Sequence, residues 1–129
     1  MGGYGALKIA LRNPEKYAAV AGLSSVADAQ DFVNVHAPKV GLLCFGEDMK
    51  VPESEDLFAL AEKCNTAAVK PRIMMIEGDR DFLLDGNRRL KEKFESLDYD
   101  YIYKEEPGAH SWLFWDTHIQ RVLKWMLGK

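Results

Sequence analysis

The chain has 129 residues, a net charge of −3, and a composition that is 47% hydrophobic and 29% charged. This length suits one domain, and the apolar content excludes an intrinsically disordered chain. The negative charge argues against nucleic-acid binding, and no apolar run approaches the roughly 20 residues that cross a membrane. Cys44 and Cys64 form neither a disulfide framework nor a metal motif, and no cofactor motif is present. The composition therefore predicts a cytoplasmic protein with free thiols and without metal or cofactor.

The first half of the chain predicts a helix, a strand and a long irregular segment. A glycine-rich opening leads into helix-forming residues 6–12, which an Asn-Pro pair ends. Residues 17–23 form a short apolar run that is typical of a strand covered on both faces. Residues 26–65 mix apolar side chains with chain breakers, and they predict a partly helical, cap-like insertion that ends in a helix at 56–63.

The second half of the chain predicts strands and helices in alternation. The expected elements are a strand at 72–76, a polar loop at 77–81, a helix at 83–97, a strand at 100–104, a loop at 105–110 and a helix at 111–127. Ser111 is the expected N-cap of the last helix, whose Trp and Phe residues are assigned to the core and His118 to its solvent side. Alternating strands and helices predict an α/β fold with three parallel strands in a single domain over residues 1–129.

Polar residues follow each predicted strand, at the end of the sheet where ligands bind in open α/β folds. In chain order they are Ser24 and Ser25, then Glu77, Asp79 and Asp81, then Glu105, Glu106 and His110. A carboxylate such as Asp81 and an imidazole such as His110, after neighbouring strands, match two members of a nucleophile–His–Asp site. Taken singly, each of these residues is more often a turn or capping residue. As a catalytic candidate, His36 in the insertion ranks below His110. Cys44 and Cys64 are more often small buried hydrophobic residues.

Three segments carry a combined pattern that is more specific than its parts. They read Met-Gly-Gly-Tyr-Gly-Ala at 1–6, Gly-Asp-Arg-Asp-Phe-Leu at 78–83 and Gly-Ala-His-Ser-Trp at 108–112. In this order they resemble α/β-hydrolases of the esterase D type, which include S-formylglutathione hydrolases and tributyrin esterases. The first segment is similar to the residues that follow the nucleophilic serine in the elbow Gly-x-Ser-Met-Gly-Gly. The resemblance spans essentially the whole chain and is closest to the tributyrin esterase branch.

The resemblance implies a carboxylic-ester hydrolase for small short-chain acyl esters or thioesters. The site residues that it assigns are Asp81 as the triad carboxylate, His110 as the base, the Met1 backbone N–H as an oxyanion donor, and Gly2 and Gly3 as elbow glycines. The serine of the pattern would precede Met1, and the serines after the first strand lack the flanking glycines. We therefore expect a partial α/β-hydrolase fold, the C-terminal portion of such an enzyme, and no ester hydrolysis by the 129-residue chain alone.

Two other classes of function stay open from the sequence. One is a non-catalytic α/β fragment or pseudo-enzyme that self-associates or binds a partner. A flavodoxin-like or receiver domain is weaker, because it needs a phosphate loop or an acidic cluster after the first strand, and residues 23–25 offer neither. In the resembled fold, the strand at 18–23 pairs with a strand that this chain lacks, so the sequence also predicts a homodimer that buries this sheet edge.

Overall fold

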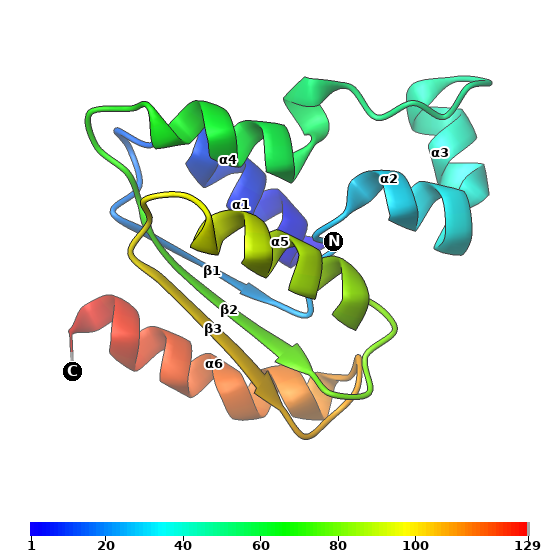
Figure 1. The fold of residues 1–129 in the computed structure, drawn as a ribbon. Helices are drawn as coiled ribbons and strands as arrows, with labels where there is room; N and C mark the ends of the chain where they lie inside the picture. The colour runs from blue at the N-terminus through cyan, green and yellow to red at the C-terminus, as the bar shows by residue number, and fades with distance from the viewer. Residues whose placement is uncertain (129) are drawn as a thin grey trace.

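The computed structural model describes residues 1–128, and within them three parallel strands form one sheet (Figure 1). The strands are β1 (Ala19–Leu23), β2 (Arg72–Gly78) and β3 (Tyr101–Glu106), in the order β1-β2-β3. Because all three run in the same direction, their carboxyl ends lie at one end of the sheet. The predicted α/β fold with three parallel strands and flanking helices is confirmed.

Helices cover both faces of the sheet. The helices α1 (Gly2–Arg12), α4 (Leu57–Asn65) and α5 (Leu84–Glu95) pack on one face, and α6 (Trp112–Leu127) packs on the other (Figure 1). Ser111 caps α6, as predicted, by accepting a hydrogen bond from the backbone N–H of Phe114. None of the helices in the described part of the chain is long and apolar enough to cross a membrane.

The segment between β1 and α4 folds into short helices that extend to one side of the sheet (Figure 1). In chain order they are α2 (Ala29–Asp31), the π-helical segment η1 (Phe32–His36), α3 (Pro38–Phe45) and the 3-10 turn η2 (Glu53–Glu55). The cap-like role of residues 26–65 stays a prediction.

The core divides into two layers because side chains alternate along β2. Ile73 and Met75 pack with apolar residues of α1, α4 and α5, whereas Met74 and Ile76 pack with Phe114 and other residues of α6. A strand that is buried on both faces has no polar alternation, which explains the continuous apolar run of β2.

The orientation of α6 contradicts two assignments made from the sequence. Phe114, His118 and Val122 are spaced four residues apart, and this stripe packs against the sheet. Trp112 lies on the opposite side of the helix and is 82% exposed, whereas His118 is buried with its ring 4.4 Å from that of Phe114. A third assignment also fails, because Cys44 is exposed, although Cys64 is buried as predicted.

The two edges of the sheet differ in their protection against pairing with another chain. β3 carries Lys104 and Glu105, and charged residues discourage edge-to-edge pairing. β1 reads Ala-Val-Ala-Gly-Leu, and no strand within residues 1–128 pairs with its outer side. We expect the chain to dimerise through this edge, and sedimentation velocity at micromolar concentration should detect a species of twice the chain mass. Ala19→Lys should shift the equilibrium from dimer toward monomer. A wild-type monomer that unfolds in one sharp transition would contradict the proposal.

Candidate active site

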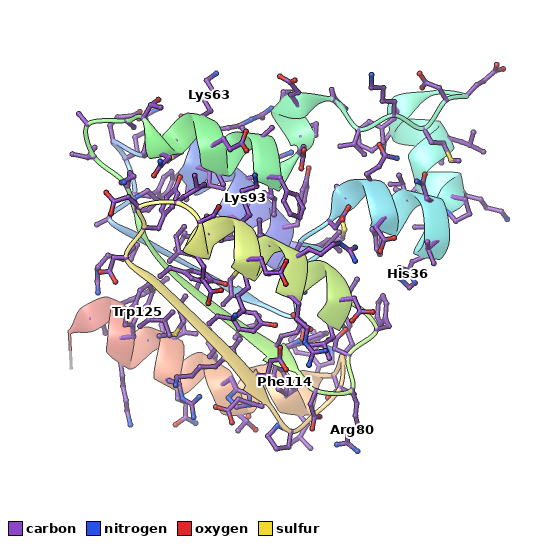
Figure 2. The ribbon with its side chains drawn as sticks, in the orientation of Figure 1. His36, Lys63, Arg80, Lys93, Phe114 and Trp125 are labelled. Atoms are coloured by element: carbon purple, nitrogen blue, oxygen red, sulfur yellow. The ribbon has the colours of Figure 1, made fainter. Side chains whose placement is uncertain are left out.

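The loops that follow β2 and β3 are tied together at the carboxyl end of the sheet. The backbone N–H of Asp79 donates to Glu106 O at 2.9 Å, and that of Arg80 donates to Gly108 O at 2.9 Å. The N–H of Gly108 donates in return to Asp79 Oδ1 at 2.9 Å. Figure 2 shows Arg80 and Phe114 near this end of the molecule. The three hydrogen bonds make the two loops one rigid platform for the side chains they carry.

This platform brings Asp81 and His110 together. The imidazole Nδ1 of His110 lies 3.0 Å from Asp81 Oδ2 and 3.3 Å from Oδ1. The Asp81 side chain is fully buried, whereas that of His110 is 30% exposed. Because a carboxylate only accepts hydrogen bonds, Nδ1 carries the proton and Nε2 is left as the acceptor. The hydrogen bond expected from the sequence is present, and the catalytic roles of the pair stay a prediction.

Both members of the pair are held in place by their surroundings. Asp81 Oδ1 also accepts a hydrogen bond from the backbone N–H of Leu83 at 3.0 Å. The His110 ring contacts two aromatic rings, with centroid distances of 5.1 Å to Phe82 and 4.9 Å to Trp115. The contact with Trp115 is edge-to-face at 87°. Packing and hydrogen bonding therefore hold the His110 ring in one orientation.

The N-terminal segment packs at the same end of the sheet. Met1 is the N-cap of α1 and is 66% exposed. A Cβ atom added to Gly3 would overlap the hydroxyl of Ser25, which follows β1, whereas one added to Gly2 would meet nothing within 4 Å. Close packing against Ser25 therefore requires glycine at position 3 but not at position 2, and the elbow role of both glycines stays a prediction. The positive end of the α1 dipole also lies at this end of the sheet (Figure 1).

The turn after β1 holds two buried serines that sequence reasoning rejected as nucleophiles. Ser24 adopts φ 48°, a conformation rare for a residue with a side chain, and Ser25 is fully buried. Neither hydroxyl has a hydrogen-bonding partner within the described residues, so neither is bonded to His110. The Asn87 side chain of α5 fixes this turn by donating to Ser25 O at 2.8 Å.

The sequence matches the Esterase family model over residues 1–126. The chain belongs to the esterase family. It is 30% identical to an acetyl esterase of Caldicellulosiruptor saccharolyticus, and the match covers 98% of the chain and 51% of the relative.

Two solved structures share the fold of this chain. The S-formylglutathione hydrolase of Staphylococcus aureus, without ligand, matches with a TM-score of 0.82 and 28% identity, over 98% of the chain and 51% of that protein. The substrate-bound fluorophosphonate-binding serine hydrolase F of the same organism matches with a TM-score of 0.84 and 26% identity, over 97% of the chain and 50% of that protein. The chain spans about half the length of the relatives it matches.

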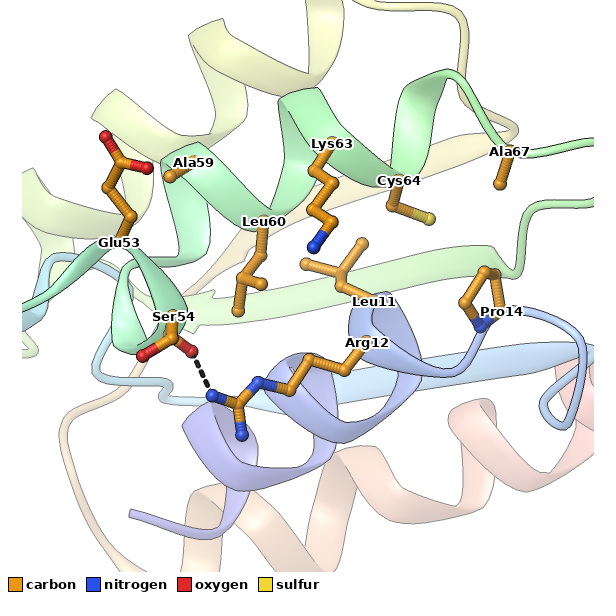
Figure 3. A pocket seen from close by; sticks show the side chains of 10 residues that line it. All are labelled: Leu11, Arg12, Pro14, Glu53, Ser54, Ala59, Leu60, Lys63, Cys64 and Ala67. Carbon is orange, nitrogen blue, oxygen red and sulfur yellow. Dashed lines mark hydrogen bonds between the residues drawn. The ribbon is translucent and has the colours of Figure 1, made fainter.

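Neither Asp81 nor His110 lines either of two cavities found in the chain. One, of about 580 Å³, lies between α1 and α4, where Arg12 donates to the carbonyl oxygen of Ser54 (Figure 3). Its lining includes no residue of the loops after β2 and β3. The other, of about 510 Å³, borders Met1, and its apolar lining comes mainly from the segment after β1: Val26, Ala29, Phe32, Val33, Val40, Cys44, Phe45 and Pro52. Among residues 1–128, no cluster of three His, Cys, Asp or Glu side chains is arranged to hold a metal ion.

Glu77 lies in β2 and not in the loop that the sequence predicts. The expected polar loops at 77–81 and 105–110 begin too early, because β2 and β3 continue through Gly78 and Glu106 with Glu77 paired to Glu105. Glu77 is 1% exposed at the end of β2. Burial, and next the neighbouring Asp81 carboxylate, raise the pKa of Glu77 to about 9.

The raised pKa of Glu77 predicts a stability that falls as pH rises. The folded chain keeps the Glu77 proton between the ordinary carboxyl pKa of 4.5 and about 9, whereas the unfolded chain has lost it. The stabilisation is therefore complete below pH 4.5 and is lost toward pH 9, by at most about 1.4 kcal/mol per pH unit. Chemical denaturation at pH 5, 7 and 9 measures this fall in the free energy of unfolding. Glu77→Gln should flatten the decline, and parallel pH profiles for the two proteins would contradict the prediction.

Proposed function

We propose that this chain carries the base and the acid of a serine esterase, and that the nucleophilic serine lies in a segment preceding Met1. The observation that carries the proposal is the hydrogen bond of 3.0 Å between His110 Nδ1 and the fully buried Asp81. The exposed part of His110 and the N-terminus of α1 at the same end of the sheet support it. By itself, the 129-residue chain is expected not to turn over esters.

The proposed reaction follows from the tautomer of His110. Nε2 removes the proton from the serine hydroxyl, and the serine oxygen attacks the ester carbonyl carbon. Asp81 stabilises the imidazolium that results, and the backbone N–H of Met1 donates to the oxyanion once a peptide bond precedes it. His110 then returns the proton to the leaving alcohol or thiol, and water releases the acid from the acyl-enzyme by the same two proton transfers.

The proposed substrates are short-chain acyl esters or thioesters. The apolar cavity beside Met1 supports this class, because an acyl group attached to a serine adjacent to Met1 would lie at its border. The relatives named an acetyl esterase and an S-formylglutathione hydrolase act, by those names, on one- or two-carbon acyl groups. By this proposal, residues of the 26–65 segment form the wall of the acyl pocket.

The test compares the chain alone with a joined esterase. The joined esterase places, ahead of Met1, the part of the S. aureus S-formylglutathione hydrolase that this chain does not cover. With 4-nitrophenyl acetate, the chain alone should release no more nitrophenol than its His110→Ala variant, whereas the joined esterase should turn over and react with a fluorophosphonate at its serine. Turnover by the chain alone that His110→Ala abolishes would overturn the proposal for the external serine.

A further inference from the structure

The apolar cavity of about 510 Å³ beside Met1 carries a pair of opposite charges in its wall. The charged side chains that residues 1–128 contribute to its lining are Lys8 of α1 and Glu55 of η2. The Nζ of Lys8 donates to Glu55 Oε2 at 2.5 Å, and the two side chains are 23% and 25% exposed. The pair therefore places a neutralised cation at the wall of a cavity whose remaining lining is mainly apolar.

Glu55 is held at this wall by three residues on one face of α1. Tyr4, Lys8 and Arg12 are spaced four residues apart, so they project from the same side of the helix. The Tyr4 hydroxyl donates to Glu55 O at 2.7 Å, and Arg12 donates to Glu55 Oε1 at 2.9 Å. Arg12 also donates to the carbonyl oxygen of Ser54 (Figure 3). These bonds fix the η2 turn against α1 and orient the Glu55 carboxylate toward Lys8.

The Glu55 carboxylate offsets the charge of Lys8 at neutral pH. The hydrogen bond from Lys8 is the largest cause that lowers the pKa of Glu55 below its ordinary value of 4.5, so this carboxylate is ionised. Without Glu55, the remaining contact of the Lys8 ammonium would be the Tyr4 ring, whose centroid lies 5.2 Å away. Lys8 would then present an unpaired cation to the cavity, and a carboxylate at the end of a bound acyl chain would be a suitable partner.

We infer that Glu55 is a specificity-determining residue: by pairing with Lys8 it removes the positive charge from the cavity, which therefore takes uncharged acyl groups and rejects those that end in a carboxylate. A terminal carboxylate would have to approach Glu55, a like charge, whereas a terminal methyl group would contact apolar side chains. The inference rests on the proposed function for the acyl group as ligand, but the selection between charged and uncharged ligands belongs to the cavity itself.

The test uses two esters of similar shape, ethyl butyrate and monoethyl succinate, whose acyl chains end in a methyl group and in a carboxylate. The 129-residue chain carries an acetylated N-terminus, because Met1, whose ammonium this removes, also borders the cavity. NMR titrations follow the methyl signals of Val26 and Val33, which line the cavity, with Val122 beneath α6 as the reference. The wild-type chain should bind ethyl butyrate at least about tenfold more tightly than monoethyl succinate. Equal binding of the two esters, or no shift at either cavity valine, would overturn the inference.

Variants separate the charge of Glu55 from its structural role. Glu55→Gln frees Lys8, so the preference for ethyl butyrate should fall by at least about tenfold. Glu53→Gln is the matched control, because Glu53 is exposed on the same turn and its carboxylate points away from Arg12 (Figure 3). Adding Lys8→Met to Glu55→Gln should abolish the gained binding of monoethyl succinate. A preference that is unchanged in folded Glu55→Gln, or that falls equally in Glu53→Gln, would overturn the inference, and the wild-type comparison decides it if a variant does not fold.

In the joined esterase, the same selection should appear in KM. Glu55→Gln should lower the KM for monoethyl succinate about tenfold relative to that for ethyl butyrate, with kcat within about twofold, because Glu55 acts at the end of the acyl chain and not at the reacting carbonyl. Acid release at constant pH measures both constants, and an unchanged KM ratio in an active joined esterase would overturn the inference. A joined esterase that is inactive with Glu55 in place would count against the proposed function, while the binding titrations would still decide the role of Glu55.

Discussion

Replacing His110 by alanine in the joined esterase is expected to lower kcat/KM by at least about 10⁴-fold, which is the usual cost of removing the base of a serine triad. The reason is geometric: His110 is held by Asp81 at 3.0 Å and by contacts with the rings of Phe82 and Trp115, and its Nε2 is the acceptor left for a serine proton. Labelling by a fluorophosphonate should slow in parallel, because the serine then lacks its base. Steady-state kinetics with 4-nitrophenyl acetate measures the loss.

The matched control is His36→Ala. The His36 ring lies on η1 and approaches His110 only through Phe82, with ring centroids 5.1 Å apart at each contact. Its removal should change kcat/KM by no more than a few-fold. Asp81→Asn should lower kcat/KM by about 10⁴-fold, because an amide no longer selects the Nδ1–H tautomer of His110. Equal losses for the two histidine variants would assign the effect to folding and contradict the role of His110.

Replacing Gly78 by alanine is expected to destabilise the chain by about 2–3 kcal/mol and to displace His110 from Asp81. A Cβ at Gly78 would lie 2.7 Å from the carbonyl oxygen of Gly108 and 2.9 Å from its carbonyl carbon. Both are backbone atoms, so the loop that carries His110 must move as a whole. That movement would strain the bond from the N–H of Arg80 to the same oxygen.

Gly5→Ala is the matched control for this substitution. Gly5 lies within α1, and a Cβ added there would meet nothing within 4 Å. Alanine in a helix should stabilise the chain by up to about 1 kcal/mol. Urea denaturation of the two variants measures the difference in stability. In NMR spectra, the low-field signal of the His110 Nδ1–H proton, which is bonded to Asp81, should be lost in Gly78→Ala alone. Similar stabilities for both variants would show that the loop accommodates a methyl group freely.

Local sequence determined much of this protein. The order of helices and strands follows from short apolar runs, helical spacing and chain breakers such as the Asn-Pro pair after α1, which act within a few residues. Asp81 and His110 were identifiable as a pair because parallel strands end at the same side of a sheet and because the surrounding motifs resemble one family. The esterase family and the three-stranded parallel fold were therefore within reach of the sequence.

The tertiary structure alone decided which polar residues lie inside. Glu77 reads as a loop residue, and only the pairing of β2 with β3 and the helices above them bury it at the end of the sheet. Trp112 and His118 exchange their expected environments because the face of α6 that meets the sheet is chosen by Phe114 and Val122. Burial of a polar group depends on partners that are distant in the chain, and their positions are set by packing, not by the periodicity of any one segment.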